Sequence, residues 1–414
     1  MNIAVYSHYF TPEIGAPSAR IHDLSRNWVQ SGHTVDVITC FPNHPIGRLY
    51  PGYTAGWYMK EMLDDIRVHR HRTYITPNSG YFKKTLGHIS YLPSALMVSN
   101  RRLGQPDVVI GTSPTFFAAI AAALTGMQRN APFIMEIRDL WPAIFVELGI
   151  LRNAQVIRWL EWLELWLYHR ATKLVTVTES FRKNLIARGI APEKIHTIPN
   201  GADPNFWRPA SQISSLQREL GLENRFVVLY IGAHGISHAL GRLLESAERL
   251  KNTPDICFVF VGEGVEKSAL MTKARELRLN NVLFHDSVDK TGVRNFYSLA
   301  DICLVPLRDI PLFDSFLPSK MFEIMAMERP IIGSVRGEAA DILNRSKAAV
   351  VVEPEDSAAI AEAVLHLYHH REAAEMMGKQ GREFLIKHYT RAALSEKYVH
   401  VMQEAIREHQ GHSK

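Results

Sequence analysis

The residues best suited to binding a phosphorylated ligand lie between Pro318 and Glu323. Pro318 and Ser319 follow an apolar run at 302–306 and supply a helix start. Backbone N–H groups at a helix start favour a phosphate. Glu323 lies four residues after Ser319 and on the same helix face, where its carboxylate could accept hydrogen bonds from a ribose. The alternative is a surface glutamate in an ordinary strand–helix unit, because helix ends that suit anions are common.

A second group of charged residues ends a predicted strand at 133–137, where Glu136 is followed by Arg138 and Asp139. Parallel α/β sheets bind ligands at the carboxyl ends of their strands, so we expect a functional role for this group. The alternative is that these charges are simply solvated. Gly15 lies after the first strand, 2–6, and would allow a phosphate close to the backbone.

The elements that position these residues alternate between strand and helix patterns. At 414 residues the chain is too long for one ordinary core, and two domains are expected. The alternation in each half predicts an α/β fold with parallel, doubly wound sheets. Gly232 and Gly235 close one strand–helix turn of the second half, although each such turn alone is weak evidence. The Asn200-Gly201 turn marks the connection between the halves.

Composition indicates a globular cytoplasmic protein, with 46% hydrophobic and 21% charged residues. The longest apolar candidate, 115–127, is shorter than the roughly 20 residues needed to span a bilayer. The chain opens directly with a strand, so we expect no signal peptide. Cys40, Cys257 and Cys303 lie singly in apolar runs and are predicted to be reduced core residues.

The formal net charge of +5 belongs to the first half, where residues 1–205 carry 21 Lys and Arg against 15 Asp and Glu. The basic residues are densest at 60–102, where Lys83 and Lys84 adjoin aromatic residues. This pattern favours an anionic membrane or a lipid phosphate as partner, rather than nucleic acid. The alternative is a solvated basic face.

Six motifs in order resemble the retaining glycosyltransferases of family four, nearly end to end. These are TPEIGAPSAR (11–20), IRDLWP (137–142), IPNGAD (198–203), YIGAHG (230–235), VGEG (261–264) and PSKMFEIMAMERPII (318–332). The ordered set is specific, although each piece is not. The IRDLWP and PSKMFE forms are similar to bacterial enzymes that add N-acetylated amino sugars, such as N-acetylfucosamine, in O-antigen and capsule assembly.

The resemblance implies the GT-B fold, two Rossmann-like domains facing across a cleft. The expected domains are an acceptor-binding domain at 1–204, a nucleotide-sugar-binding domain at 205–388, and a helix at 389–414 that returns to the first domain. By the same resemblance, Glu323 binds the ribose. The remaining donor contacts are the backbone of Ser319 and Lys320, the Gly15 loop, Gly232, His234 and Gly235. Lys320 would neutralise phosphate charge, while Arg138 and Asp139 complete the cleft.

Three positions depart from the family pattern: Ser315 and His238 stand where many members have Glu and Lys, and Arg138 where a His is common. A neutral His cannot replace a fixed charge. There is no Asp-x-Asp motif, so we expect no metal and no other cofactor.

The implied function is transfer of an N-acetylhexosamine-type sugar from a UDP-sugar, with retention, to a polyprenyl-diphosphate-linked saccharide. The enzyme would act peripherally on the inner face of the plasma membrane. The alternatives are a UDP-N-acetylhexosamine epimerase and a non-catalytic nucleotide-sugar-binding protein.

Overall fold

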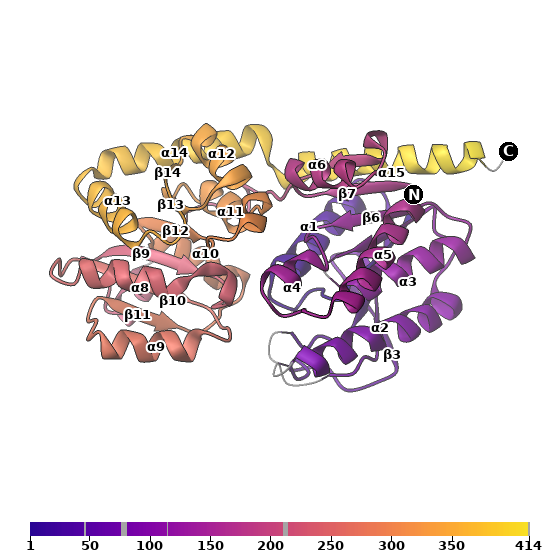
Figure 1. The fold of residues 1–414 in the computed structure, drawn as a ribbon, viewed down its shortest axis with the longest axis horizontal. Coiled ribbons are helices and arrows are strands. Elements are labelled where there is room, and N and C mark those ends of the chain that lie inside the picture. The colour runs from indigo at the N-terminus through magenta and orange to yellow at the C-terminus, as the bar shows by residue number, and fades with distance from the viewer. Residues whose placement is uncertain (45–46, 76–80, 114, 210–213, 413–414) are drawn as a thin grey trace. The chain divides into compact units, whose positions relative to one another are not determined.

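The computed structural model describes residues 1–44, 47–75, 81–113, 115–209 and 214–412, without the side chains of 81–84, 214 and 412. The chain divides into two units (Figure 1). Unit 1 comprises Met1–Pro199 with Arg391–Lys414, and unit 2 comprises Asn200–Thr390. The sequence prediction placed the divisions after residues 204 and 388. Each unit carries its own sheet.

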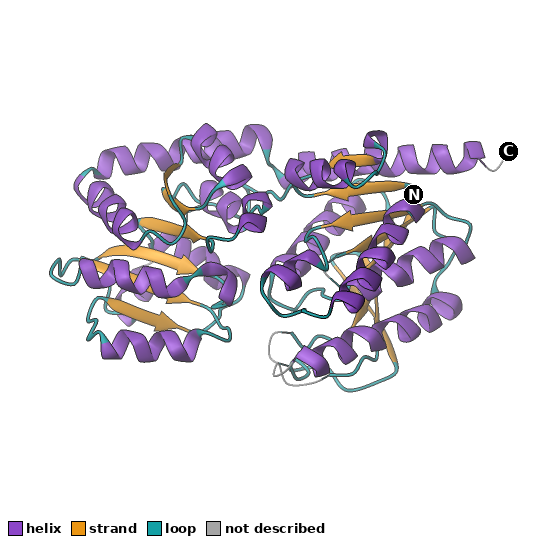
Figure 2. Cartoon of the chain, in the orientation of Figure 1, coloured by secondary structure: helices purple, strands orange, loops and turns teal. Residues whose placement is uncertain are grey.

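The sheet of unit 1 has the strand order β3-β4-β2-β1-β5-β6-β7-β8 within the described residues. Its strands are among those drawn in orange in Figure 2. They pair in parallel, except that β3 runs antiparallel to β4. The strands are β1 (Asn2–Tyr6), β2 (Thr34–Cys40), β3 (Tyr58–Leu63), β4 (Ile66–His71), β5 (Val108–Thr112), β6 (Phe133–Ile137), β7 (Lys173–Thr176) and β8 (Ile195–Thr197). The helices are α1 (Ala16–Gln30), α2 (Tyr81–Arg102), α3 (Phe116–Gln128), α4 (Ala143–Glu147), α5 (Ala154–Arg170), α6 (Glu179–Ala187) and α15 (Arg391–His412).

The hairpin of β3 and β4 corrects part of the sequence prediction for residues 60–102. We expected an exposed basic surface there, and Lys60, Arg72, Arg101 and Arg102 are exposed, but β4 lies between β3 and β2. His69, Arg70 and His71 on β4 are therefore buried. Arg70 donates hydrogen bonds to Glu61 and to backbone oxygens. The positive charge of Arg70 on this strand is therefore paired inside unit 1. The side chains of Lys83 and Lys84, which the prediction also named, lie outside the described residues.

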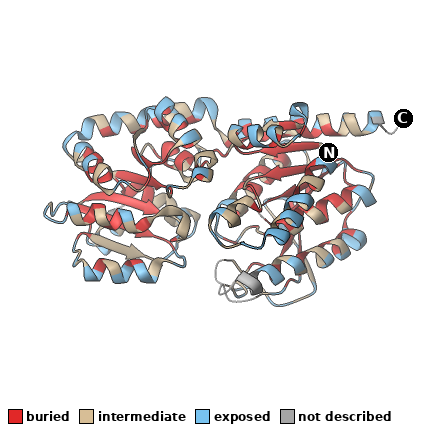
Figure 3. Cartoon of the chain, viewed as in Figure 1, coloured by how far each residue is buried: buried red, intermediate tan, exposed pale blue. Residues whose placement is uncertain are grey.

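One face of the unit 1 sheet is closed by α15 together with α1. The apolar spacing of α15 buries Leu394, Tyr398, Val401, Met402 and Ala405 in the same core as Trp28 of α1. The Trp28 and Tyr398 rings meet edge to face at 5.2 Å, and Trp28 Nε1 donates to the Ser395 carbonyl at 3.3 Å. The last helix of the chain is thus part of the core built by its first helix (Figure 3).

Unit 2 contains a parallel sheet with the order β11-β10-β9-β12-β13-β14 in the described residues. Its strands are β9 (Phe226–Ile231), β10 (Ile256–Val261), β11 (Val282–His285), β12 (Ile302–Pro306), β13 (Ile331–Ser334) and β14 (Ala349–Val352). Its helices are α7 (Ser214–Glu219), α8 (Leu240–Arg249), α9 (Lys267–Glu276), α10 (Lys290–Leu299), α11 (Lys320–Ala326), α12 (Gly337–Ser346), α13 (Ser357–His369) and α14 (Arg371–His388).

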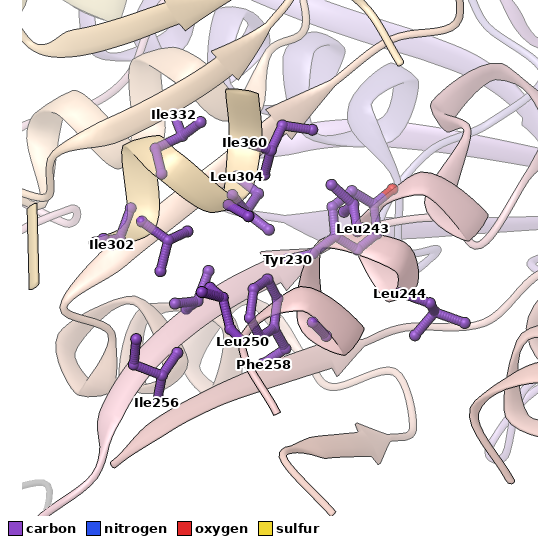
Figure 4. Packing of buried hydrophobic residues seen from close by; sticks show 14 of the residues in the cluster. Tyr230, Leu243, Leu244, Leu250, Ile256, Phe258, Ile302, Leu304, Ile332 and Ile360 are labelled. Atoms are coloured by element: carbon purple, nitrogen blue, oxygen red, sulfur yellow. The ribbon is translucent and has the colours of Figure 1, made fainter. Parts of the chain in front are cut away.

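The core of unit 2 forms where α8 and α13 pack against the central strands. Strands β9, β10 and β12 are buried along their whole length, as expected for parallel strands covered on both faces. Figure 4 shows side chains from this cluster, including Tyr230, Phe258 and Leu304. Both units therefore have the parallel α/β architecture expected from the sequence.

Candidate active site

Two glycine turns at the carboxyl ends of β9 and β10 interlock through their backbones. The Gly232 N–H donates to the Val261 carbonyl at 3.0 Å, and the His234 N–H donates to the Glu263 carbonyl at 2.9 Å. A Cβ on Gly262 would lie 2.0 Å from the Gly232 oxygen, and one on Gly264 would lie 2.3 Å from the His234 oxygen. Glycine is therefore the residue that fits at both positions of the second turn.

Lys320, the first residue of α11, directs its ammonium group at the first of these turns. Its Nζ lies 4.1 Å from the ring centroid of Tyr230, a cation–π contact. A Cβ on Gly232 would lie 2.7 Å from Nζ, so a side chain at 232 would displace the lysine. Nζ is buried and has no hydrogen-bond partner among the described residues. Burial lowers the pKa of Lys320 to about 7, although Glu323 favours its charged form.

Glu323 stands one turn beyond Lys320 on the same helix face. Tyr297 of α10 donates its hydroxyl to Glu323 Oε2 at 3.3 Å. The neighbours Met321, Phe322, Ile324 and Met325 are buried, which fixes the rotation of the helix and leaves Glu323 half-buried. Ser319 precedes the helix as expected, but its side chain makes no capping hydrogen bond.

The two histidines near the first turn are neutral. The His234 ring is fully buried, stacks on Tyr230 at 5.9 Å and meets Phe260 and Phe284 edge-on. It therefore offers no exposed atom to a ligand in this conformation. Burial lowers the pKa of His234 to about 4 and that of His238 to about 3. Lys320 is thus the one of these three groups that titrates near neutral pH.

Gly235 and Ser315 are the remaining positions in unit 2 that the sequence prediction discussed. Nothing lies within 4 Å of a Cβ built on Gly235, so the surface beside it is open. Ser315 stands where many members of the family have a glutamate. Its hydroxyl donates to the Leu312 carbonyl at 2.6 Å.

In unit 1, the charged group after β6 is organised around Glu136. Its carboxylate is fully buried, accepts a hydrogen bond from Arg20 Nε at 2.9 Å and another from Thr112 at 2.8 Å. Arg20 also donates to the carbonyls of Ile198 and Pro199. These bonds give Glu136 a structural role, because they connect β6 to α1 and, through Arg20, to the backbone at residues 198–199.

Arg138 and Asp139 follow at the carboxyl end of the strand. The Arg138 N–H donates to Ser113 Oγ at 2.8 Å. Its Nε and Nη1 are buried and have no hydrogen-bond partner among the described residues. Burial lowers the pKa of Arg138 to about 10, so the guanidinium stays charged at neutral pH, and burial raises the pKa of Asp139. Buried donors without acceptors are rare, and a charged pair of them suits an anionic ligand.

The Gly15 loop is held by a residue that the sequence analysis did not single out. Glu13 is buried and accepts hydrogen bonds from the N–H groups of Asn43, His44 and Phe10 at 2.7, 2.8 and 3.2 Å. Gly15 itself adopts φ 154° and caps α1. The loop conformation therefore rests on Glu13 rather than on Gly15 alone.

The structure thus brings together Gly232, Lys320 and Glu323 in unit 2, whereas Gly15, Arg138 and Asp139 lie in unit 1. Within the described parts of the chain, no cluster of three or more His, Cys, Asp or Glu side chains is placed to hold a metal ion. None of the helices described has the length and hydropathy to cross a bilayer.

Comparison with known proteins agrees with this architecture in both halves. Residues 15–201 match the glycosyl transferase 4-like domain, and residues 225–370 match glycosyl transferases group 1. The chain belongs to the glycosyltransferases with the GT-B fold. The predicted fold class and the predicted enzyme class are therefore confirmed.

Individual relatives are distant from this glycosyltransferase in sequence. It is 26% identical over 334 residues to the putative colanic acid biosynthesis glycosyl transferase WcaI of Escherichia coli K12, covering 79% of this chain and 81% of that protein. Sucrose-phosphate synthase from Thermosynechococcus elongatus has a TM-score of 0.77 at 17% identity, covering 98% of this chain and 99% of that chain. Anabaena Alr3699/HepE, solved in complex with UDP and glucose, has a TM-score of 0.73 at 15% identity, covering 98% and 100%. At these identities the two structures support the fold.

Besides Glu13, three site residues of the glycosyltransferase were not predicted from the sequence: Tyr230, Tyr297 and Arg20. Tyr230 and Tyr297 lie in apolar runs, where a tyrosine that binds a functional side chain looks like any other core aromatic. Arg20 lies inside a helix, and its partner Glu136 is 116 residues away. The available signal was a charged residue at a position that shares a helix face with Ile21, Leu24 and Trp28, which indicates a buried ion pair.

Proposed function

We propose that this glycosyltransferase moves an N-acetylhexosamine-type sugar, with retention, from a UDP-sugar to a polyprenyl-diphosphate-linked saccharide in surface polysaccharide synthesis. The proposal places it peripherally on the cytoplasmic face of the membrane. Its main support is the buried Lys320 ammonium, which lacks a hydrogen-bond acceptor and faces the Gly232 turn one helical turn from Glu323. The relative WcaI is named for colanic acid biosynthesis, and Alr3699/HepE was solved with UDP, which supports a nucleotide-sugar donor and a polysaccharide product.

The proposed roles follow from the chemistry of each group. Glu323 accepts hydrogen bonds from the ribose hydroxyls, and its orientation is held by Tyr297. Lys320 neutralises charge on the diphosphate as it leaves, which stabilises the transition state. Arg138 of unit 1, beside Asp139, contributes a positive charge that is retained at neutral pH. With these two cations available, we propose that transfer needs no metal ion and no other cofactor.

The transfer proposed is a front-face substitution. The bond between the sugar C1 and the diphosphate oxygen breaks as the acceptor oxygen bonds to C1. The acceptor proton passes to the departing diphosphate, which leaves as UDP. Since a phosphate oxygen serves as the base, no protein carboxylate is required at Ser315.

A panel of UDP-sugars with extracted polyprenyl-diphosphate saccharides tests the proposal, with products identified by mass spectrometry and their anomeric configuration by NMR. We expect a lipid product extended by one N-acetylhexosamine of unchanged configuration. An altered sugar from UDP-sugar alone would support the epimerase alternative. Tight UDP-sugar binding without turnover on any lipid acceptor would support the binding protein. Transfer abolished by EDTA and restored by a divalent cation would refute the metal-free chemistry.

A further inference from the structure

Residues 143–163 form an apolar segment that the core of unit 1 does not bury. Of its 21 residues 14 are apolar, against 46% for the whole chain, yet none is buried. The segment contains α4 and the first half of α5 (Figure 1). Trp159 is 57% exposed and Trp162 is 60% exposed. Scattered exposed apolar residues are normal, but a continuous patch marks an interaction surface.

The helix α5 has one side that packs on unit 1 and one that does not. The packed side lies in the second half of the helix, where Leu167 and Tyr168 are buried and Glu164 pairs with Arg188 at 2.5 Å. At about 100° per residue, Trp159, Trp162 and Trp166 lie on one side of the helix, roughly opposite to those anchors. Trp159 and Trp162 are exposed and Trp166 is half-buried, so α5 has an apolar side in addition to its docked side.

The composition of this face favours a lipid interface as its occupant. Indole rings combine apolar area with an N–H donor and are enriched where a bilayer meets water. The exposed Arg152 and Arg158 have apolar stems that can lie along lipid while their guanidinium groups reach headgroup phosphates.

The charge of the unit supports the same occupant. Unit 1 contains 25 Lys and Arg against 17 Asp and Glu, whereas unit 2 contains 22 against 25. A positively charged unit is attracted to anionic lipid and repelled by a second copy of itself.

Topology places this face near the charged end of β6. Both α4 and the start of α5 follow the carboxyl end of β6, where Arg138 and Asp139 lie. The segment from Asp139 to Ala143 is only a few residues long. A bilayer against α4 and α5 would therefore bring lipid headgroups to the edge of the sheet that carries Arg138.

We propose that the exposed apolar face of α5, centred on Trp159 and Trp162, inserts into the interface of an anionic membrane. This inference rests on the proposed function for its lipid-linked acceptor, but it concerns a different surface from the nucleotide site. It also differs from the Lys83–Lys84 prediction, because the apolar face supplies the insertion.

The test is co-sedimentation with vesicles of phosphatidylcholine, with and without phosphatidylglycerol. We expect Trp159→Glu/Trp162→Glu to lower the partition coefficient onto anionic vesicles by at least about tenfold, since two large apolar contacts are lost. The matched control is Met271→Glu/Met376→Glu, which adds the same charge at exposed apolar positions of unit 2. It should bind vesicles like the wild type.

A second variant separates insertion from misfolding. Brominated lipid should quench wild-type tryptophan fluorescence, and Trp159→Phe/Trp162→Phe should keep most vesicle binding but show less quenching than the wild type. Equal vesicle binding by the wild type and the double glutamate variant would overturn the inference. A wild type that forms dimers lost in that variant, without binding vesicles, would assign the face to a second copy instead. UDP binding by calorimetry, unchanged in all variants, keeps this outcome separate from the proposed function.

Discussion

Replacing Lys320 by methionine should stabilise the unliganded enzyme while weakening nucleotide binding. Methionine has a similar length, carries no charge and adapts to irregular packing. The pKa of Lys320 lies at about 7 against an ordinary value of 10.5, a consequence of burial. At about 1.4 kcal/mol per pKa unit, the folded protein loses on the order of 4 kcal/mol at neutral pH by burying this amine. We expect Lys320→Met to recover about 2–4 kcal/mol and to raise the Tm of the unliganded protein by on the order of 5 °C.

The sign of the pH dependence provides an internal check. Because the pKa of Lys320 is lower in the folded than in the unfolded protein, folding releases a proton between about pH 7 and 10.5. The contribution of this group to the free energy of unfolding therefore rises with pH across that window. The stability gap between Lys320→Met and the wild type should be largest at or below neutral pH, and should narrow as the pH approaches about 10.

Nucleotide binding should show the opposite response to the substitution. The charged amine suits a diphosphate, so UDP affinity of the wild type should fall as pH rises through about 7, and binding should take up a proton. Calorimetry in buffers of different ionisation enthalpy measures that uptake. Loss of one charge-assisted contact, worth about 1.5–3 kcal/mol, should weaken UDP binding by roughly tenfold to hundredfold.

The control for Lys320→Met is Lys379→Met, which removes an exposed lysine of α14 in the same unit. It should leave both the melting temperature and UDP affinity close to wild type. A Lys320→Met protein that melts below the wild type, or that binds UDP equally well, would refute this account of the site.

Four further perturbations test other parts of the structure. Glu323→Ala should lose roughly 2–4 kcal/mol of transition-state stabilisation with an unchanged circular dichroism spectrum, and wild-type kinetics would exclude the ribose contact. Tyr398→Ala should cost about 3–5 kcal/mol of unfolding free energy because its ring is buried against Trp28. Deletion of 390–414 should lower the Tm further, the exposed-site variant His400→Ala should not, and an unchanged melting curve of the deletion would contradict docking of α15. Lys83→Glu/Lys84→Glu should reduce sedimentation with anionic vesicles and raise KM for a lipid acceptor without changing UDP affinity, whereas equal sedimentation at low salt would exclude that patch.

The local sequence pattern was sufficient to predict most strands of the two sheets. Strands such as Phe226–Ile231 and Ile302–Pro306 are continuous apolar runs bounded by turn residues, and this pattern survives burial on both faces. The helix after Ser319 was predicted from start signals that are also local, whereas the helix at 389–414 was expected from the family resemblance. Strands β3 and β4 were missed, because His69, Arg70 and His71 are polar residues whose burial depends on partners distant in sequence.

The candidate site shows the same difference between features visible in the local sequence and features set by tertiary packing. Glu323 and the glycine turns were proposed from their positions relative to strand ends and helix starts, which are local, whereas Lys320 was proposed through the family resemblance. The environment of Lys320 could not be predicted, since its low pKa arises from burial, and the Tyr230 ring and the Gly232 turn that lie against its ammonium belong to a different strand–helix unit. The roles of Glu136 and Trp159 were also undetermined by sequence, because a carboxylate and an indole each suit a core or a surface. Tertiary packing decided both: it enclosed Glu136 with Arg20 and left Trp159 without a covering layer, and burial is set by the whole fold rather than by neighbouring residues.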